Sequence, residues 1–67
     1  MIVYVDLFAR LREKGWTARR LVKERKLGNG TIDRLRKGES VSTDTINTIC
    51  ELLQCQPGDI LRYEEEE

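Results

Sequence analysis

Residues 17–38 read TARRLVKERKLGNGTIDRLRKG, and this stretch decides the fold. Thr17 is suited to start a helix, because its hydroxyl can accept a hydrogen bond from a free backbone amide. Gly28 and Gly30 disfavour an uninterrupted helix, so the first helix is expected to fail near Arg25 or Lys26. A second short helix is then expected from about residue 29 to residue 37.

The apolar residues of this stretch indicate how the two helices pack. They recur at helical spacing in both segments, and they can face one another only if the helices cross steeply. Leu27 then fills the corner between them. A capped helix, a tight break and a second short helix packed in this way form a helix-turn-helix unit. The inward-facing residues are Leu21, Val22, Ile32 and Leu35.

The flanking sequence predicts three more helices. One runs from Asp6 to Lys14, one follows Ser42 as its N-cap, and a short fifth helix covers Pro57 to Leu61. The apolar ends of the chain could form a two-stranded ribbon that braces the monomer or builds a dimer contact. The predicted fold class is therefore all-α, a compact five-helix domain over residues 1–67.

The zero net charge of the 67 residues hides a strong segregation. Between Arg10 and Lys37 there are eleven Lys or Arg against three acids, and the rest of the chain has one Arg against nine acids. Four of those acids form the closing run from Glu64 to Glu67. A basic block concentrates near polyanions such as nucleic acid, although such charges can also be solvated helix faces.

The residue pattern argues against several classes of function. No apolar run approaches the ~20 residues of a membrane span, and the first residues lack a signal peptide's pattern, so a cytoplasmic protein is expected. Ser40 and Ser42 have no histidine partner, and nothing indicates an enzyme, a cofactor or a small-molecule ligand. Cys50 and Cys55 fall short of a metal site and are interpreted as small buried hydrophobic residues.

Three segments carry a family resemblance over Leu7 to Tyr63. The chain resembles the small single-domain branch of the lambda-repressor/Cro-like (XRE) helix-turn-helix regulators. The resemblance implies a regulator of transcription built from five short helices. The segments that carry it are residues 31–39 (TIDRLRKGE), 41–46 (VSTDTI) and 55–60 (CQPGDI).

The resemblance also implies which residues contact DNA bases and which contact phosphates. Residues at the start and on the outer face of the third helix would contact bases: Asn29, Gly30, Asp33 and Arg34. The start of the second helix and the loop after the third would contact phosphates: Thr17, Ala18, Arg19, Lys37 and Ser40. Charge alone adds Arg20, Lys26 and Arg36 as phosphate candidates.

Two departures from the family pattern affect the turn and the start of the second helix. Lys26 stands where the family usually has a glycine, so Lys26 is expected to be strained, or Gly28 to carry the unusual φ instead. Lys26→Gly is accordingly predicted to stabilise the fold. Ala18 stands where the family often has a glutamine, which removes one side-chain phosphate contact.

Some of these residues have plainer interpretations. Arg34 could pair with Glu24 or Glu39 on the surface, and Asn29 is a natural turn residue whatever its function. Trp16 is expected to cover the core. Tyr4 and Tyr63 are expected to pack against each other or against a partner.

The sequence thus predicts a regulator, acting as a repressor, that binds duplex DNA with the helix at residues 29–37. A homodimer on a palindromic operator is one possible form. The alternative is a protein-interaction module of the same fold, antitoxin-like or an antirepressor partner, with little DNA binding. The salt dependence of DNA affinity would distinguish the two.

Overall fold

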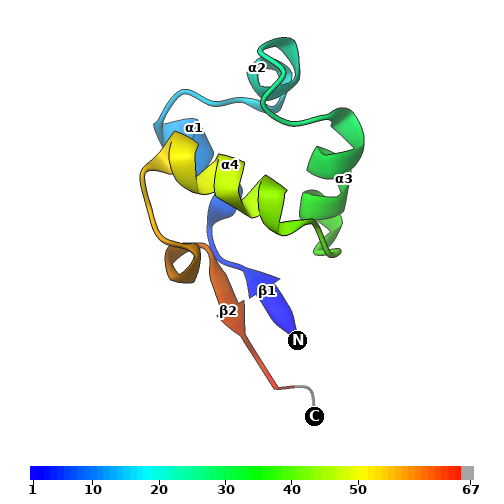
Figure 1. Ribbon diagram of the computed structural model, residues 1–67, viewed down its shortest axis with the longest axis vertical. Coiled ribbons are helices and arrows are strands. Elements are labelled where there is room, and N and C mark those ends of the chain that lie inside the picture. The colour runs from blue at the N-terminus through cyan, green and yellow to red at the C-terminus, as the bar shows by residue number, and fades with distance from the viewer. Residues whose placement is uncertain (66–67) are drawn as a thin grey trace.

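The computed structural model describes residues 1–65, and within them the chain is mainly helical. α2 and α3 cross steeply at one end of the molecule, and a two-stranded ribbon projects from the other end (Figure 1). The elements in chain order are β1 (Ile2–Tyr4), α1 (Leu7–Glu13), α2 (Ala18–Lys23), α3 (Asn29–Lys37), α4 (Thr43–Leu53), the 3-10 helix η1 (Pro57–Asp59) and β2 (Leu61–Tyr63).

The short fifth helix predicted at Pro57 to Leu61 ends earlier than expected, at Asp59, and is not an α-helix. The chain instead makes a 3-10 turn of three residues, in which the amide of Gln56 donates to Asp59 Oδ2 at 2.9 Å. Ile60 is completely buried directly after this turn, and Leu61 begins β2. An α-helix cannot continue there, because Leu61 is extended and pairs with β1.

The two ends of the chain form the ribbon that the sequence left open. β1 and β2 are antiparallel, with Ile2 opposite Tyr63 and Tyr4 opposite Leu61. Tyr4 and Tyr63 are therefore not cross-strand partners. The Tyr4 hydroxyl instead donates to the carbonyl oxygen of Glu39 at 2.5 Å, which ties the ribbon to the α3–α4 loop.

The four α-helices of residues 1–65 share one way of ending. After each helix one residue takes a left-handed conformation, and the amide of the following residue bonds back to a carbonyl five positions earlier. This arrangement satisfies carbonyl groups that have no partner inside the helix. The left-handed residues are Gly15, Arg25, Gly38 and Gln54.

The helix starts confirm the predicted caps. The Thr17 hydroxyl accepts from the Arg20 amide, and the Ser42 hydroxyl accepts from the Thr45 amide, both at 3.2 Å. Asp6 precedes α1 in a left-handed conformation and makes no side-chain cap bond, so that helix begins at Leu7. These local hydrogen bonds fix where α2 and α4 start.

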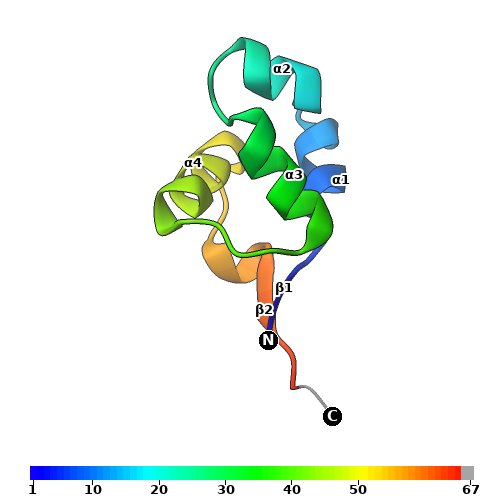
Figure 2. The ribbon, with the colours of Figure 1, turned by 90° about the vertical axis from the view of Figure 1, so that its right-hand side faces the viewer.

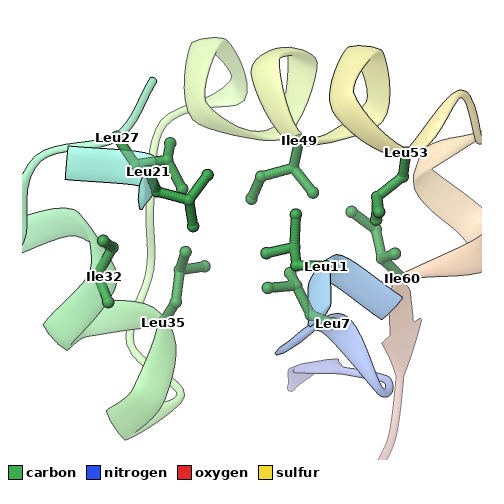
Figure 3. Close-up of a cluster of buried hydrophobic side chains, with 9 residues drawn as sticks. All are labelled: Leu7, Leu11, Leu21, Leu27, Ile32, Leu35, Ile49, Leu53 and Ile60. Carbon is green, nitrogen blue, oxygen red and sulfur yellow. The ribbon is translucent and has the colours of Figure 1, made fainter. Parts of the chain in front are cut away.

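The buried core has two groups of side chains joined through α4. Figure 3 shows one group from α2, the α2–α3 turn and α3, and a second group from α1, α4 and the segment after η1. Ile49 of α4 lies above Leu11, at the edge of the second group that faces the first. Ile49 is fully buried and thereby links the helix-turn-helix unit to the rest of the fold. The core residues are Leu7, Leu11, Leu21, Leu27, Ile32, Leu35, Ile49, Leu53 and Ile60.

Within residues 1–65, no helix has the length and apolar character needed to cross a membrane. Cys50 and Cys55 are free thiols, and both are half-buried rather than buried as expected.

Candidate nucleic-acid interface

The turn between α2 and α3 sets how the two helices cross (Figure 2). Arg25, with φ 59°, is its left-handed residue. The amide of Arg25 donates to the Val22 carbonyl at 3.0 Å, and the amide of Lys26 donates to the Leu21 carbonyl at 2.9 Å. These two bonds form a Schellman closure, in which the left-handed residue directly precedes the residue that reaches back furthest.

The expectation for this turn is therefore wrong by one residue. Neither Lys26 nor Gly28 has a positive φ, because Lys26 supplies the long backward bond and Gly28 is extended, with φ −82°. Gly28 is the N-cap of α3 and has no side chain to complete the cap. Leu27, buried between them, fills the corner as predicted.

The outer face of α3 gathers the four residues expected to contact bases. Ile32 and Leu35 point into the core, so α3 exposes its remaining polar side to solvent. A Cβ built on Gly30 would meet nothing within 4 Å, so the helix surface is open there. The exposed residues on this side include Asn29, Gly30, Asp33 and Arg34.

Two of the predicted contact residues are paired with each other in the free protein. Lys37 Nζ lies 2.9 Å from Asp33 Oδ2, and both side chains are about 60% exposed (62% and 59%). A pair this exposed contributes little to folding, so each partner is available to another ligand at low cost. Arg34 belongs to no ion pair within residues 1–65, so the pairing with Glu24 or Glu39 is not formed.

Arg20 has a structural role that charge alone did not reveal. Its guanidinium lies 4.1 Å from the centre of the Trp16 ring, donates to the Gly15 carbonyl at 3.1 Å and pairs with Glu24 at 2.5 Å. Trp16 is half-buried against the core, as predicted. Arg20 therefore holds the α1–α2 loop in place and has little freedom to reach a phosphate.

Arg36 is also partly engaged, with its guanidinium 5.8 Å from the centre of the Phe8 ring. The Arg36 side chain therefore packs toward α1, and Arg36 remains exposed to solvent. Among the other candidates, Ser40 lies away from α2, in a hollow beside the ribbon that Ile2 and Tyr4 also line.

A hollow of about 800 Å³ lies between α2 and α3. Its apolar residues are Ala18, Val22 and Ile32. Its polar residues include three cations and one carboxylate: Arg19, Lys23, Arg36, Asn29 and Asp33. A concave surface on which cations outnumber carboxylates three to one suits a sugar–phosphate strand, whose phosphates are neutralised by Lys and Arg.

Lys23 is the contact candidate that sequence reasoning missed. It lies one helical turn after Arg19 on α2, and both line the same hollow. The spacing of four residues is the signal that could have identified it, because such residues share a helix face.

Comparisons with known proteins return helix-turn-helix proteins. Residues 7–66 match the family model described as Cro/C1-type HTH DNA-binding domain. A 41-residue stretch, 61% of this chain, is 39% identical to an uncharacterized HTH-type transcriptional regulator, YozG, of Bacillus subtilis strain 168. The aligned stretch covers 49% of that relative, so the match spans about half of its length. No solved structure matches the chain significantly.

Proposed function

The chain belongs to the Cro/C1-type helix-turn-helix DNA-binding family, and from that premise we propose that it is a sequence-specific regulator of transcription. In this proposal α3 enters the major groove of duplex DNA, which is wide enough for one helix. The observation that carries the proposal is the exposed polar face of α3 beside a hollow lined by cations.

The proposed base contacts follow from the donors and acceptors on α3. Arg34 carries two donors suited to the acceptor pair of guanine, and Asn29 matches the donor and acceptor of adenine. Asp33 accepts from the amino group of cytosine once Lys37 releases it. Gly30 contributes by having no side chain, which lets the helix approach the base edges closely.

The proposed phosphate contacts surround that face. Arg19 and Lys23 act from α2, and Lys37 acts from the end of α3. Further proposed phosphate contacts, at the margins of this set, are Thr17, Ala18, Lys26 and Ser40. Arg36, whose guanidinium lies over the Phe8 ring, is an additional one. Arg20 is the weakest member, because three partners within the chain already hold it.

We also propose that the protein acts as a repressor and binds as a homodimer to a palindromic operator. One module of this size makes few contacts, and two copies on half-sites about one helical turn apart would double them. A domain that binds an operator overlapping a promoter represses by excluding the polymerase. The relative's name supports a role in transcription for that protein and leaves the direction of regulation to experiment.

Selection from a random duplex library, followed by sequencing, tests the proposal. We expect a recovered half-site, repeated with two-fold symmetry, and an affinity whose logarithm falls steeply with the logarithm of the salt concentration. Recovery of a single, unrepeated site would support DNA recognition but would contradict binding as a dimer.

A flat or absent DNA signal, together with tight binding to a co-purifying protein, would favour the protein-interaction module instead. One observation supports that alternative. The large apolar side chains that the described chain exposes, Met1, Ile2 and Tyr63, all lie on the ribbon, where a protein partner could cover them.

A further inference from the structure

The C-terminal end of α4 brings together the two thiols of the protein. Gln54 is left-handed there, with φ 52°, and the amide of Cys55 donates to the Cys50 carbonyl at 3.1 Å. Helix endings of this type frequently carry an apolar contact between the side chains of the two residues that the bond joins. At the ends of the other three α-helices the same backbone bond joins Leu11 to Trp16, Leu21 to Lys26 and Arg34 to Glu39, whereas on α4 it joins two cysteines.

The environment of Cys50 agrees with a close thiol pair. Burial raises the pKa of Cys50, and the neighbouring Cys55 thiol and then the Asp59 carboxylate raise that pKa further. Cys50 is therefore protonated at neutral pH and is a weak nucleophile on its own.

Both cysteines are open to a small reagent. They line one hollow of about 550 Å³ on the outer side of α4, together with Ile46, Pro57 and Leu61. Both are half-buried and neither is part of the α2–α3 hollow.

We propose that Cys50 and Cys55 form a dithiol site that a small disulfide oxidant, of the glutathione class, converts reversibly into an intramolecular disulfide. Disulfides join residues whose Cα atoms lie roughly 4.4–6.8 Å apart. The direct backbone bond between the two residues keeps them close enough for such a bridge without rearrangement of the helix. The proposal does not depend on the DNA-binding function.

The reaction proceeds by two exchange steps. The Cys55 thiolate attacks one sulfur of oxidised glutathione, and a glutathione thiolate leaves. The Cys50 sulfur then loses its proton to solvent and attacks the Cys55 sulfur of the mixed disulfide, which expels the second glutathione. The protein gives up two protons and two electrons, and one oxidised glutathione becomes two reduced ones.

The bridge closes a short loop, so its effect on stability is expected to be small and positive. It fixes the last turn of α4 against the segment that leads into η1. Because the hollow that holds the thiols shares no lining residue with the α2–α3 hollow, oxidation should leave the affinity for duplex DNA unchanged.

Peptide mapping of the intact, folded protein treated with oxidised glutathione tests the proposal. Cleavage after Glu51 separates the two cysteines unless a disulfide joins them. We expect one joined peptide pair that lacks two hydrogen masses, and its return to two peptides after reduction. Cys50→Ser should instead retain a glutathione on Cys55, whereas Cys55→Ser should react slowly, because the pKa of Cys50 is raised.

Treatment of the protein unfolded in urea provides the control. If the helix end organises the pair, intramolecular disulfide should exceed mixed disulfide in the folded protein by about tenfold or more relative to the unfolded chain. Equal ratios in the two states, a persistent glutathione adduct on the folded wild-type protein, or no reaction at either thiol would each overturn the proposal.

Discussion

The two ends of the molecule's 39 Å long axis expose opposite kinds of surface (Figure 1). At the α2–α3 end the exposed side chains are mostly charged, and cations line the hollow between the helices. At the ribbon end Met1, Ile2 and Tyr63 are 53–67% exposed (54%, 53% and 67%). A chain with no net charge can therefore present a cationic surface at one end and an apolar surface at the other. The net charge does not reveal these two surfaces, because they arise from how the fold distributes the side chains.

The largest expected effect comes from the residue that joins the two ends. Ile49→Ala removes a fully buried side chain that lies between the two halves of the core, and we expect a loss of about 2–5 kcal/mol in the free energy of unfolding. Chemical denaturation followed by circular dichroism measures this loss. Ile2→Ala, at a site 53% exposed, is the control and should cost far less. Similar losses for the two variants would show that Ile49 does not link the halves.

Next in size is the effect of Arg34→Ala on DNA recognition. If Arg34 contacts a guanine, its loss should remove ~1–3 kcal/mol of discrimination at one position of the operator. Binding assays on operators substituted base by base measure this. Arg62→Ala, at the ribbon end, removes the same charge and should leave DNA affinity unchanged. Uniform weakening on every sequence would make Arg34 a phosphate contact.

The turn supplies a smaller, stabilising change. Arg25→Gly should raise the free energy of unfolding by about 1 kcal/mol, because a left-handed residue with a Cβ is strained. Thermal unfolding measures the gain. Lys26→Gly, which the sequence predicted to stabilise the fold, becomes the matched control. It should give no gain in stability, because Lys26 has no positive φ. A gain from Lys26→Gly alone would show that the turn is assigned to the wrong residue.

The smallest expected effect is a change in stability at alkaline pH that comes from Tyr4 in the ribbon. Burial raises the pKa of Tyr4 above its ordinary value of 10.0, so the folded state holds this proton more tightly than the unfolded chain does. The associated stability is complete below pH 10.0 and is lost as the pH rises through the folded pKa. Tyr4→Phe should therefore lower the slope of melting temperature against pH in that range. An unchanged slope would contradict the role of Tyr4.

The features that sequence reasoning predicted correctly are those set by nearby residues. The bounds of α3 and the caps at Thr17 and Ser42 follow from apolar spacing and from side chains that bond within three residues. The turn was misplaced because its usual marker, a glycine, is absent. Arg25 is left-handed only because of where the last bonds of α2 fall.

Features that depend on distant contacts were harder to predict. Pro57 to Leu61 has the composition of a short helix, and only pairing with β1 makes Leu61 extended. In the candidate site, counting charges could not separate Arg20, held over Trp16, from Arg34. It also passed over Lys23, whose place in the hollow depends on how α3 crosses α2. Of the acidic run, Glu66 and Glu67 lie outside the described residues.

The ribbon also bears on the order in which the protein folds. Its outermost backbone bond, from the amide of Glu64 to the carbonyl of Met1, joins residues 63 positions apart, whereas the bonds that end the helices span five. Closing so long a loop is entropically expensive until the helices have shortened the path between its ends. We therefore expect the ribbon to pair after the rate-limiting step. Substitutions in its strands should then accelerate unfolding and leave the folding rate nearly unchanged.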